Sequence, residues 1–93
     1  MATAPATSVS TDPSLDQDGI TAYSLIYAKI KEGDSAADNK EPQTAIDIYR
    51  SALQDLERLK SSKPEFQPFI VEYRLRDLAR KTKAQEEALN AKK

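Results

Sequence analysis

The side chains of this chain that could do chemistry are carboxylates, hydroxyls and basic groups, because the sequence has no histidine and no cysteine. Without histidine it lacks the commonest general base and metal ligand, and its hydroxyls have no imidazole to activate them. Without cysteine it has neither disulfides nor a thiolate zinc site. The sequence therefore predicts no catalytic residue, no metal ligand and no cofactor, and we expect a protein that is not an enzyme.

Two pairs of carboxylates come close together in the sequence. Asp34 and Asp38 are four residues apart and share one helix face, but this is the polar face, so we expect two solvated charges. Glu86 and Glu87 are adjacent and point in different directions on a helix. The chain also has only two glycines, too few for a glycine-rich phosphate loop. None of these patterns predicts catalysis or nucleotide binding.

Three basic residues, Arg76, Arg80 and Lys83, share one side of a predicted helix, away from its apolar side. An acidic partner surface or a nucleic acid could dock there. Acidic residues also lie four positions from several basic ones, which is the spacing of ordinary ion pairs on a helix surface. The stripe is therefore either a solvated face or a partner site, and nucleic acid is the less expected partner.

Three helices must position these groups. Apolar residues recur every three or four positions in three segments, which predicts helices from 19 or 20 to 38, from 42 to 60, and from 65 or 68 to 89. No segment alternates with period two, so we expect no strand. Short connections predict an all-α, three-helix antiparallel array with a longer third helix, whose polar last turns should project or fray.

The domain organisation follows from composition. Residues 1–18, rich in Ala, Thr, Ser, Pro and Asp, are predicted to be a disordered tail, 19–89 the three-helix domain, and 90–93 a frayed end. The net charge is −1, yet residues 74–93 carry seven Lys or Arg against three acidic residues. No apolar run could span a bilayer and no signal peptide is visible, so a cytoplasmic location is favoured.

Residue sizes predict how the helices pack. Small residues at Gly33, Ala45 and Ala52 allow two helices to come close, and Tyr49 is expected to fill the space between them and the third helix. A glycine within a helix costs about 1 kcal/mol relative to alanine, so we expect a second backbone close to it. The wide apolar arc of residues 42–60 predicts a central helix. Phe66 should plug the open end of the core.

These four positions give the sequence its resemblance to a tetratricopeptide repeat, over about residues 20–60. Gly33, Ala45, Tyr49 and Ala52 have the separations that the repeat uses for its Gly, Ala, aromatic and Ala residues. The sequence departs from the repeat in several places. Glu32 and Ala36 replace large residues, Lys40 replaces a glycine in the turn, and the closing proline is absent.

The sequence is also similar, less closely, to the microtubule-interacting and trafficking domain, a three-helix relative of that repeat. The stretch "ADNKEPQTAIDIYRSAL" resembles the start of the second helix of that domain, and "YRLRDLARK" imperfectly matches its third helix. An unrelated three-helix bundle is the remaining interpretation.

The resemblance implies a protein–protein interaction or assembly module with a protein or peptide partner. In tetratricopeptide proteins the first helix of each hairpin lines the concave groove, which makes Tyr23, Tyr27, Lys31 and Asp34 candidate peptide contacts. The alternative is that the tyrosines belong to the core, with hydroxyls in water. A single repeat needs neighbours, so either the third helix covers it or copies associate through a side that contains Leu75, Leu78 and Leu89.

Overall fold

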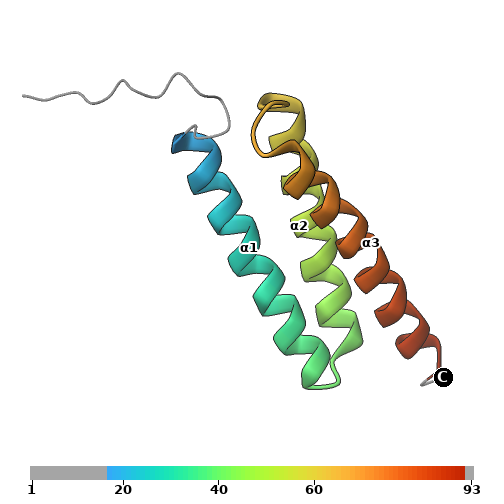
Figure 1. Ribbon diagram of the computed structural model, residues 1–93. Helices are drawn as coiled ribbons and strands as arrows, with labels where there is room; N and C mark the ends of the chain where they lie inside the picture. Colours follow the sequence, from blue (N-terminus) through green and yellow to red (C-terminus); the bar gives the residue numbers. More distant parts are fainter. Residues whose placement is uncertain (1–16, 92–93) are drawn as a thin grey trace, which may run out of the picture.

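A computed structural model describes residues 17–91 of the chain, which form three α-helices. They are α1 (Gln17–Asp38), α2 (Pro42–Ser62) and α3 (Pro68–Ala91). Successive helices run in opposite directions and are joined by short turns (Figure 1). No residue between 17 and 91 is in a strand. The predicted all-α, three-helix antiparallel array is therefore confirmed.

Helix α2 is the central helix, as its wide apolar arc predicts. It packs against α1 on one side and α3 on the other, whereas α1 and α3 barely approach each other (Figure 1). Its inner residues Ala45, Ala52 and Leu56 are completely buried. From α3, Val71 and Leu78 complete the same core, so α3 covers the side of α2 that α1 leaves open.

The contact between Gly33 and Tyr49 fixes the α1–α2 packing. A Cβ atom added to Gly33 would lie 2.6 and 2.7 Å from two ring atoms of Tyr49, whose side chain is buried. Tyr49 also faces α3, since the ammonium of Lys81 lies 5.9 Å from its ring centroid. The expected role of Tyr49 is confirmed, but the group that needs Gly33 is this ring rather than a second backbone.

The turn between α1 and α2 places a lysine in the left-handed region. Lys40 has φ 62°, and its amide donates to the carbonyl of Ala37 at 3.1 Å. The amide of Glu41 donates to Ala36 at 2.9 Å, which completes a Schellman motif. The left-handed residue is therefore Lys40, the position where the resembled repeat has glycine. Pro42 begins α2, where its missing N–H is of no consequence.

The second turn closes one end of the core. Phe66 is buried as expected, with its ring against Gly19 and at 6.4 Å, centroid to centroid, from the ring of Tyr23. Gln67, with φ 40°, follows, and α3 begins at Pro68, the later of the two expected starts. Aromatic packing from the turn thus fixes the first turns of α1.

The helix ends differ from the predicted boundaries by a few residues. Gln17 and Asp18 form the first turn of α1, and the rest of the predicted tail lies outside the described residues. At the other end, α3 continues to Ala91, while residues 92 and 93 lie outside the described part. Glu86, within the last turns that were expected to project or fray, binds Arg50 of α2 at 2.5 Å.

Candidate partner-binding site between α1 and α3

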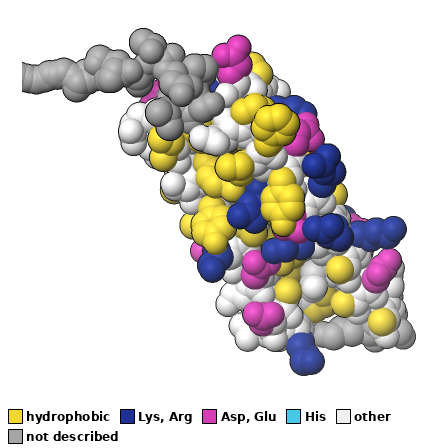
Figure 2. Space-filling model, in the orientation of Figure 1, with side chains coloured by type: hydrophobic (Ala, Val, Ile, Leu, Met, Phe, Trp, Pro, Cys, Tyr) yellow, Lys and Arg dark blue, Asp and Glu magenta, His cyan; other side chains and the backbone are white. Residues whose placement is uncertain are grey.

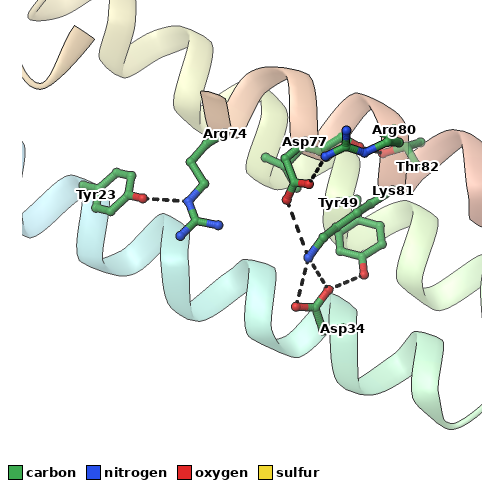
Figure 3. Close-up of polar contacts among 9 residues, drawn as sticks. Tyr23, Asp34, Tyr49, Arg74, Asp77, Arg80, Lys81 and Thr82 are labelled. Carbon is green, nitrogen blue, oxygen red and sulfur yellow. Dashed lines mark hydrogen bonds and ion pairs between the residues drawn. The ribbon is translucent and has the colours of Figure 1, made fainter. Parts of the chain in front are cut away.

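Polar side chains bridge α1 and α3 where the two backbones do not touch. Lys81 of α3 binds both carboxylate oxygens of Asp34 in α1, at 2.9 and 3.1 Å. The hydroxyl of Tyr49 in α2 donates to the same carboxylate at 2.5 Å, so one acidic group joins three helices (Figure 3). Asp77 lies 3.7 Å from Lys81 and completes the network.

The network shifts two pKa values in opposite directions. Burial of Asp34 opposes its ionisation, but hydrogen bonds from Tyr49 and Lys81 outweigh this, so the pKa of Asp34 lies below its ordinary value. Burial of the Tyr49 phenol, together with its hydrogen bond to Asp34, raises the pKa of Tyr49 well above its ordinary value. At neutral pH the network therefore has an ionised carboxylate and a neutral phenol, and its role is structural.

A second bridge, nearer the start of α1, consists of Arg74 and three tyrosines. The Nε atom of Arg74 donates to the hydroxyl of Tyr23 at 2.9 Å (Figure 3). Its guanidinium carbon lies 5.3 Å from the ring centroid of Tyr27 and 5.6 Å from that of Tyr73, within cation–π range. The hydrogen bond to Tyr23 raises the pKa of Arg74, so its charge is permanent.

Apolar side chains surround this bridge at the surface. Figure 2 shows hydrophobic side chains gathered over α1 and α3, with basic ones among them. Tyr27 is 40% exposed, Ile70 44% and Tyr73 52%. Next to them lies a hollow of about 230 Å³, lined by Ile20, Tyr23, Ser24, Phe66, Gln67 and Ile70. We call the surface that includes Ile20, Tyr23, Tyr27, Ile70, Tyr73 and Arg74 the α1–α3 face.

The four candidate contacts on α1 are differently placed. Tyr27 and Lys31 are exposed, and the Lys31 ammonium lies 5.7 Å from the Tyr27 ring centroid. Tyr23 is partly buried and its hydroxyl is bound by Arg74. Asp34 was expected to be a solvated charge or a peptide contact, but its carboxylate is committed to the internal network. Tyr27 and Lys31 have the exposure that the peptide-contact prediction requires, and the Asp34 side chain is also 40% exposed although its carboxylate accepts hydrogen bonds from Lys81 and Tyr49.

The basic stripe of α3 remains on the surface. Arg76, Arg80 and Lys83 are all exposed, and Arg80 binds Asp77 at 2.6 Å. Glu72 forms an ion pair with Lys60 of α2, so it braces α2 against α3. The expected ion pairs of the helix surface are thus present in part. No hydrogen bond or cation–π contact joins the residues of the stripe to the bridge formed by Arg74 and the three tyrosines.

Sequence reasoning missed the residues of α3 that face α1. Ile70, Arg74, Asp77 and Lys81 recur at intervals of four, three and four, which places them on one side of the helix. That side adjoins the apolar line of Val71 and Leu78. The helical spacing of these four residues was the signal in the sequence that could have identified them. A mixed polar stripe is easily read as solvent-facing, because nothing in the sequence says that a second helix lies opposite.

A larger hollow, of about 330 Å³, lies between α1 and the end of α2. Leu25, which is 68% exposed, is the main apolar side chain at its surface. Lys29 and Arg58 both bind Asp55 there, at 2.6 and 3.3 Å, so each of these cations already has an anionic partner. We therefore regard the α1–α3 face as the better candidate site, because Arg74 forms no ion pair with a carboxylate of the described residues.

Reactive groups and membrane spans were also sought between residues 17 and 91. These residues contain no group of three or more acidic side chains arranged to hold a metal ion. None of the three helices they form is long and apolar enough to cross a bilayer.

No protein-family model, no curated protein and no solved structure matches the chain. The resemblances to the tetratricopeptide repeat and to the microtubule-interacting and trafficking domain therefore stay predictions, and any function must be argued from the site itself.

Proposed function

We propose that this chain is a non-catalytic protein–protein interaction module of tetratricopeptide-like type, and that it binds its partner through the α1–α3 face. The observation on which this proposal rests is the bridge in which Arg74 lies beside Tyr27 and Tyr73 at the surface, next to an apolar hollow. Tyrosine and arginine are the residue types most enriched among side chains that dominate binding energy at protein interfaces.

The pre-ordering of these side chains supports the proposal. An arginine side chain normally loses much rotamer freedom when a partner immobilises it. Here the hydrogen bond to Tyr23 and the two neighbouring rings already restrain Arg74. A partner would therefore meet a surface whose ordering cost is reduced, which is the usual advantage of a pre-organised site.

Nucleic acid is a weaker fit to the same surface. Single-stranded nucleic acid needs stacking platforms inside a continuous positive groove. The face offers tyrosines but no continuous positive groove, because Lys81 and Arg80 are already paired with Asp34 and Asp77. A microtubule-interacting-and-trafficking-like peptide-binding domain differs from the main proposal in ancestry rather than in the kind of partner.

Selection from a random peptide library with the full-length chain as bait tests the proposal. We expect enriched peptides whose affinity falls about tenfold or more for the Tyr27→Ser/Tyr73→Ser variant, because losing two interface anchors typically costs well over 1.4 kcal/mol. Leu25→Ser is the matched control, since it removes an even more exposed apolar side chain from the other hollow. Circular dichroism would verify that both variants remain helical.

Two results would contradict the proposal. One is that no peptide is enriched over an empty support. The other is that enriched peptides bind the tyrosine variant as well as the parent but lose affinity for Leu25→Ser, which would move the site to the α1–α2 hollow.

A further inference from the structure

Arg74 has no anionic partner in the part of the chain that the structure describes. Its Nε atom is used by Tyr23, and in Figure 3 its two terminal nitrogens point away from that bond and bind none of the residues drawn. Among residues 17–91 no carboxylate forms an ion pair with it: Asp34 is bound by Lys81, Asp77 by Arg80, and Glu72 by Lys60. The two terminal nitrogens thus present an unused pair of donors at the surface.

The surroundings of those donors select the kind of anion. A guanidinium presents a planar fork that matches the two oxygens of a carboxylate. The flanking rings of Tyr27 and Tyr73 reduce access of water to the charge, which strengthens a hydrogen bond formed there. The ammonium of Lys31, next to Tyr27, adds a second positive charge on the same side.

The apolar hollow adjoins this anion position. Tyr23 belongs to both, because its ring lines the hollow and its hydroxyl accepts the hydrogen bond from Arg74. Ile20 and Ile70, 38% and 44% exposed, lie at the same hollow. A ligand that fills the hollow with an apolar side chain would therefore place its neighbouring residue beside Arg74.

We propose, resting on the function proposed above, that the α1–α3 face recognises a peptide segment in which an aspartate or glutamate is close to a large apolar residue. The carboxylate binds the two terminal nitrogens of Arg74, and the apolar side chain enters the hollow lined by Tyr23, Phe66 and Ile70. The charge of Arg74 favours an acidic ligand. A basic or neutral ligand would leave this charge without an anionic partner.

The decisive experiment uses the peptides obtained by selection on the full-length chain. Each is resynthesised with its acidic residue changed to the matching amide, and binding of both forms is measured to the parent, Arg74→Gln, Arg74→Lys and Arg76→Gln. We expect the amide form to bind the parent about tenfold or more weakly, since a hydrogen bond to a charged group is worth about 1.5–3 kcal/mol. Arg76→Gln, exposed two residues along α3, should behave as the parent.

The double-mutant cycle separates this inference from the proposed function. In Arg74→Gln the acidic and amide peptides should bind equally weakly, and Arg74→Lys should restore only part of the affinity because it lacks the fork. Peptides that lose affinity for the Tyr27→Ser/Tyr73→Ser variant but bind equally in acidic and amide form would overturn the inference and leave the interaction role intact. The peptide-side change needs no protein variant, so it decides the question even if Arg74→Gln does not fold.

The chain itself holds a competing occupant. Leu15 lies between Asp12 and Asp16 in the segment before α1, and this sequence has the chemistry proposed for the partner. In the full-length chain, Leu15→Ser/Asp16→Asn should leave the NMR signals of Tyr27 and Tyr73 unchanged if a separate protein is the partner. Shifts of those signals, together with tighter peptide binding, would overturn the proposal and identify the N-terminal segment as the occupant.

Discussion

At the scale of single residues, the absence of a side chain at Gly33 determines where the ring of Tyr49 lies. A methyl group there would overlap the ring, which the hydrogen bond to Asp34 holds in place. Such overpacking costs about 1–3 kcal/mol, and alanine returns about 1 kcal/mol of helix propensity, so we expect Gly33→Ala to lower stability by up to about 2 kcal/mol. Urea denaturation followed by circular dichroism would measure this.

The variant Gly33→Ala/Tyr49→Leu provides the control for that prediction. Because the smaller leucine leaves room for the methyl group, the double variant should be less destabilised than the sum of its two single changes. Additive effects would show that Gly33 and Tyr49 are not coupled, which would contradict the packing described above.

A second residue-scale prediction concerns Asp34 and acid. Its pKa is lowered in the folded chain, so its stabilising contribution is complete above the ordinary pKa of about 4 and is lost as the pH falls through the lower folded value. Because the Asp34 side chain is 40% exposed, solvent screens its ion pair, so Asp34→Asn should lower stability by only about 0.5 kcal/mol at neutral pH. This difference should shrink as acid protonates Asp34. Thermal unfolding of both chains from neutral to acidic pH would measure it.

The exposed Asp38, one turn further along α1, is the matched control. Its replacement by asparagine should leave both the stability and its acid dependence nearly unchanged, because no hydrogen bond or ion pair joins its carboxylate to another residue between 17 and 91. A difference between parent and Asp34→Asn that persists at low pH would refute the ion-pair explanation.

At the scale of elements, the first turn stores strain that a single change should release. A lysine at positive φ costs about 1 kcal/mol or more relative to glycine, which adopts this conformation freely. Lys40→Gly is therefore expected to stabilise the chain by about 0.5–1 kcal/mol, seen as a higher urea midpoint at an unchanged slope. Lys40→Ala still places a residue with a Cβ atom at positive φ, so it should give no such gain. An equal gain from Lys40→Gly and Lys40→Ala would show that the effect comes from the lysine side chain and not from the backbone.

The sequence predicted the elements well because their determinants are local. Apolar spacing, Pro42 and the Lys63–Pro68 turn are enough to place three helices to within a few residues. Intrinsic preference alone would place the left-handed residue at Asn39, but the motif geometry places it at Lys40. Local preference alone does not determine the register of a Schellman turn.

The candidate site was harder to predict because it arises between elements. Tyr27 was singled out from the resemblance, but Arg74 was not, since its role depends on α1 lying beside α3. Asp34 was expected to be solvated, because no pattern in the sequence indicates that Lys81, far along the chain, comes within 2.9 Å. Long-range ion pairs of this kind require the packing of the whole chain.

At the scale of the whole molecule, α3 covers the second side of α2. Leu78 is completely buried in the core, so the predicted leucine side is not fully available to a second copy. Only Leu75 and Leu89, both partly buried, remain along that line. Self-association through this side stays a prediction, which sedimentation at high protein concentration would test.

Sharing α2 between two neighbours makes the fold one cooperative unit. Leu78→Ala should lower stability by about 2–5 kcal/mol, because it opens a cavity in the core that the three helices share. If the unit is cooperative, amide exchange should accelerate by the same factor in α1 as in α3, although the two helices barely touch. Leu25→Ala, at an exposed position, should accelerate neither. Faster exchange in α3 alone would show that α1 and α2 form an independent hairpin, with α3 added as a separable repeat-like cap.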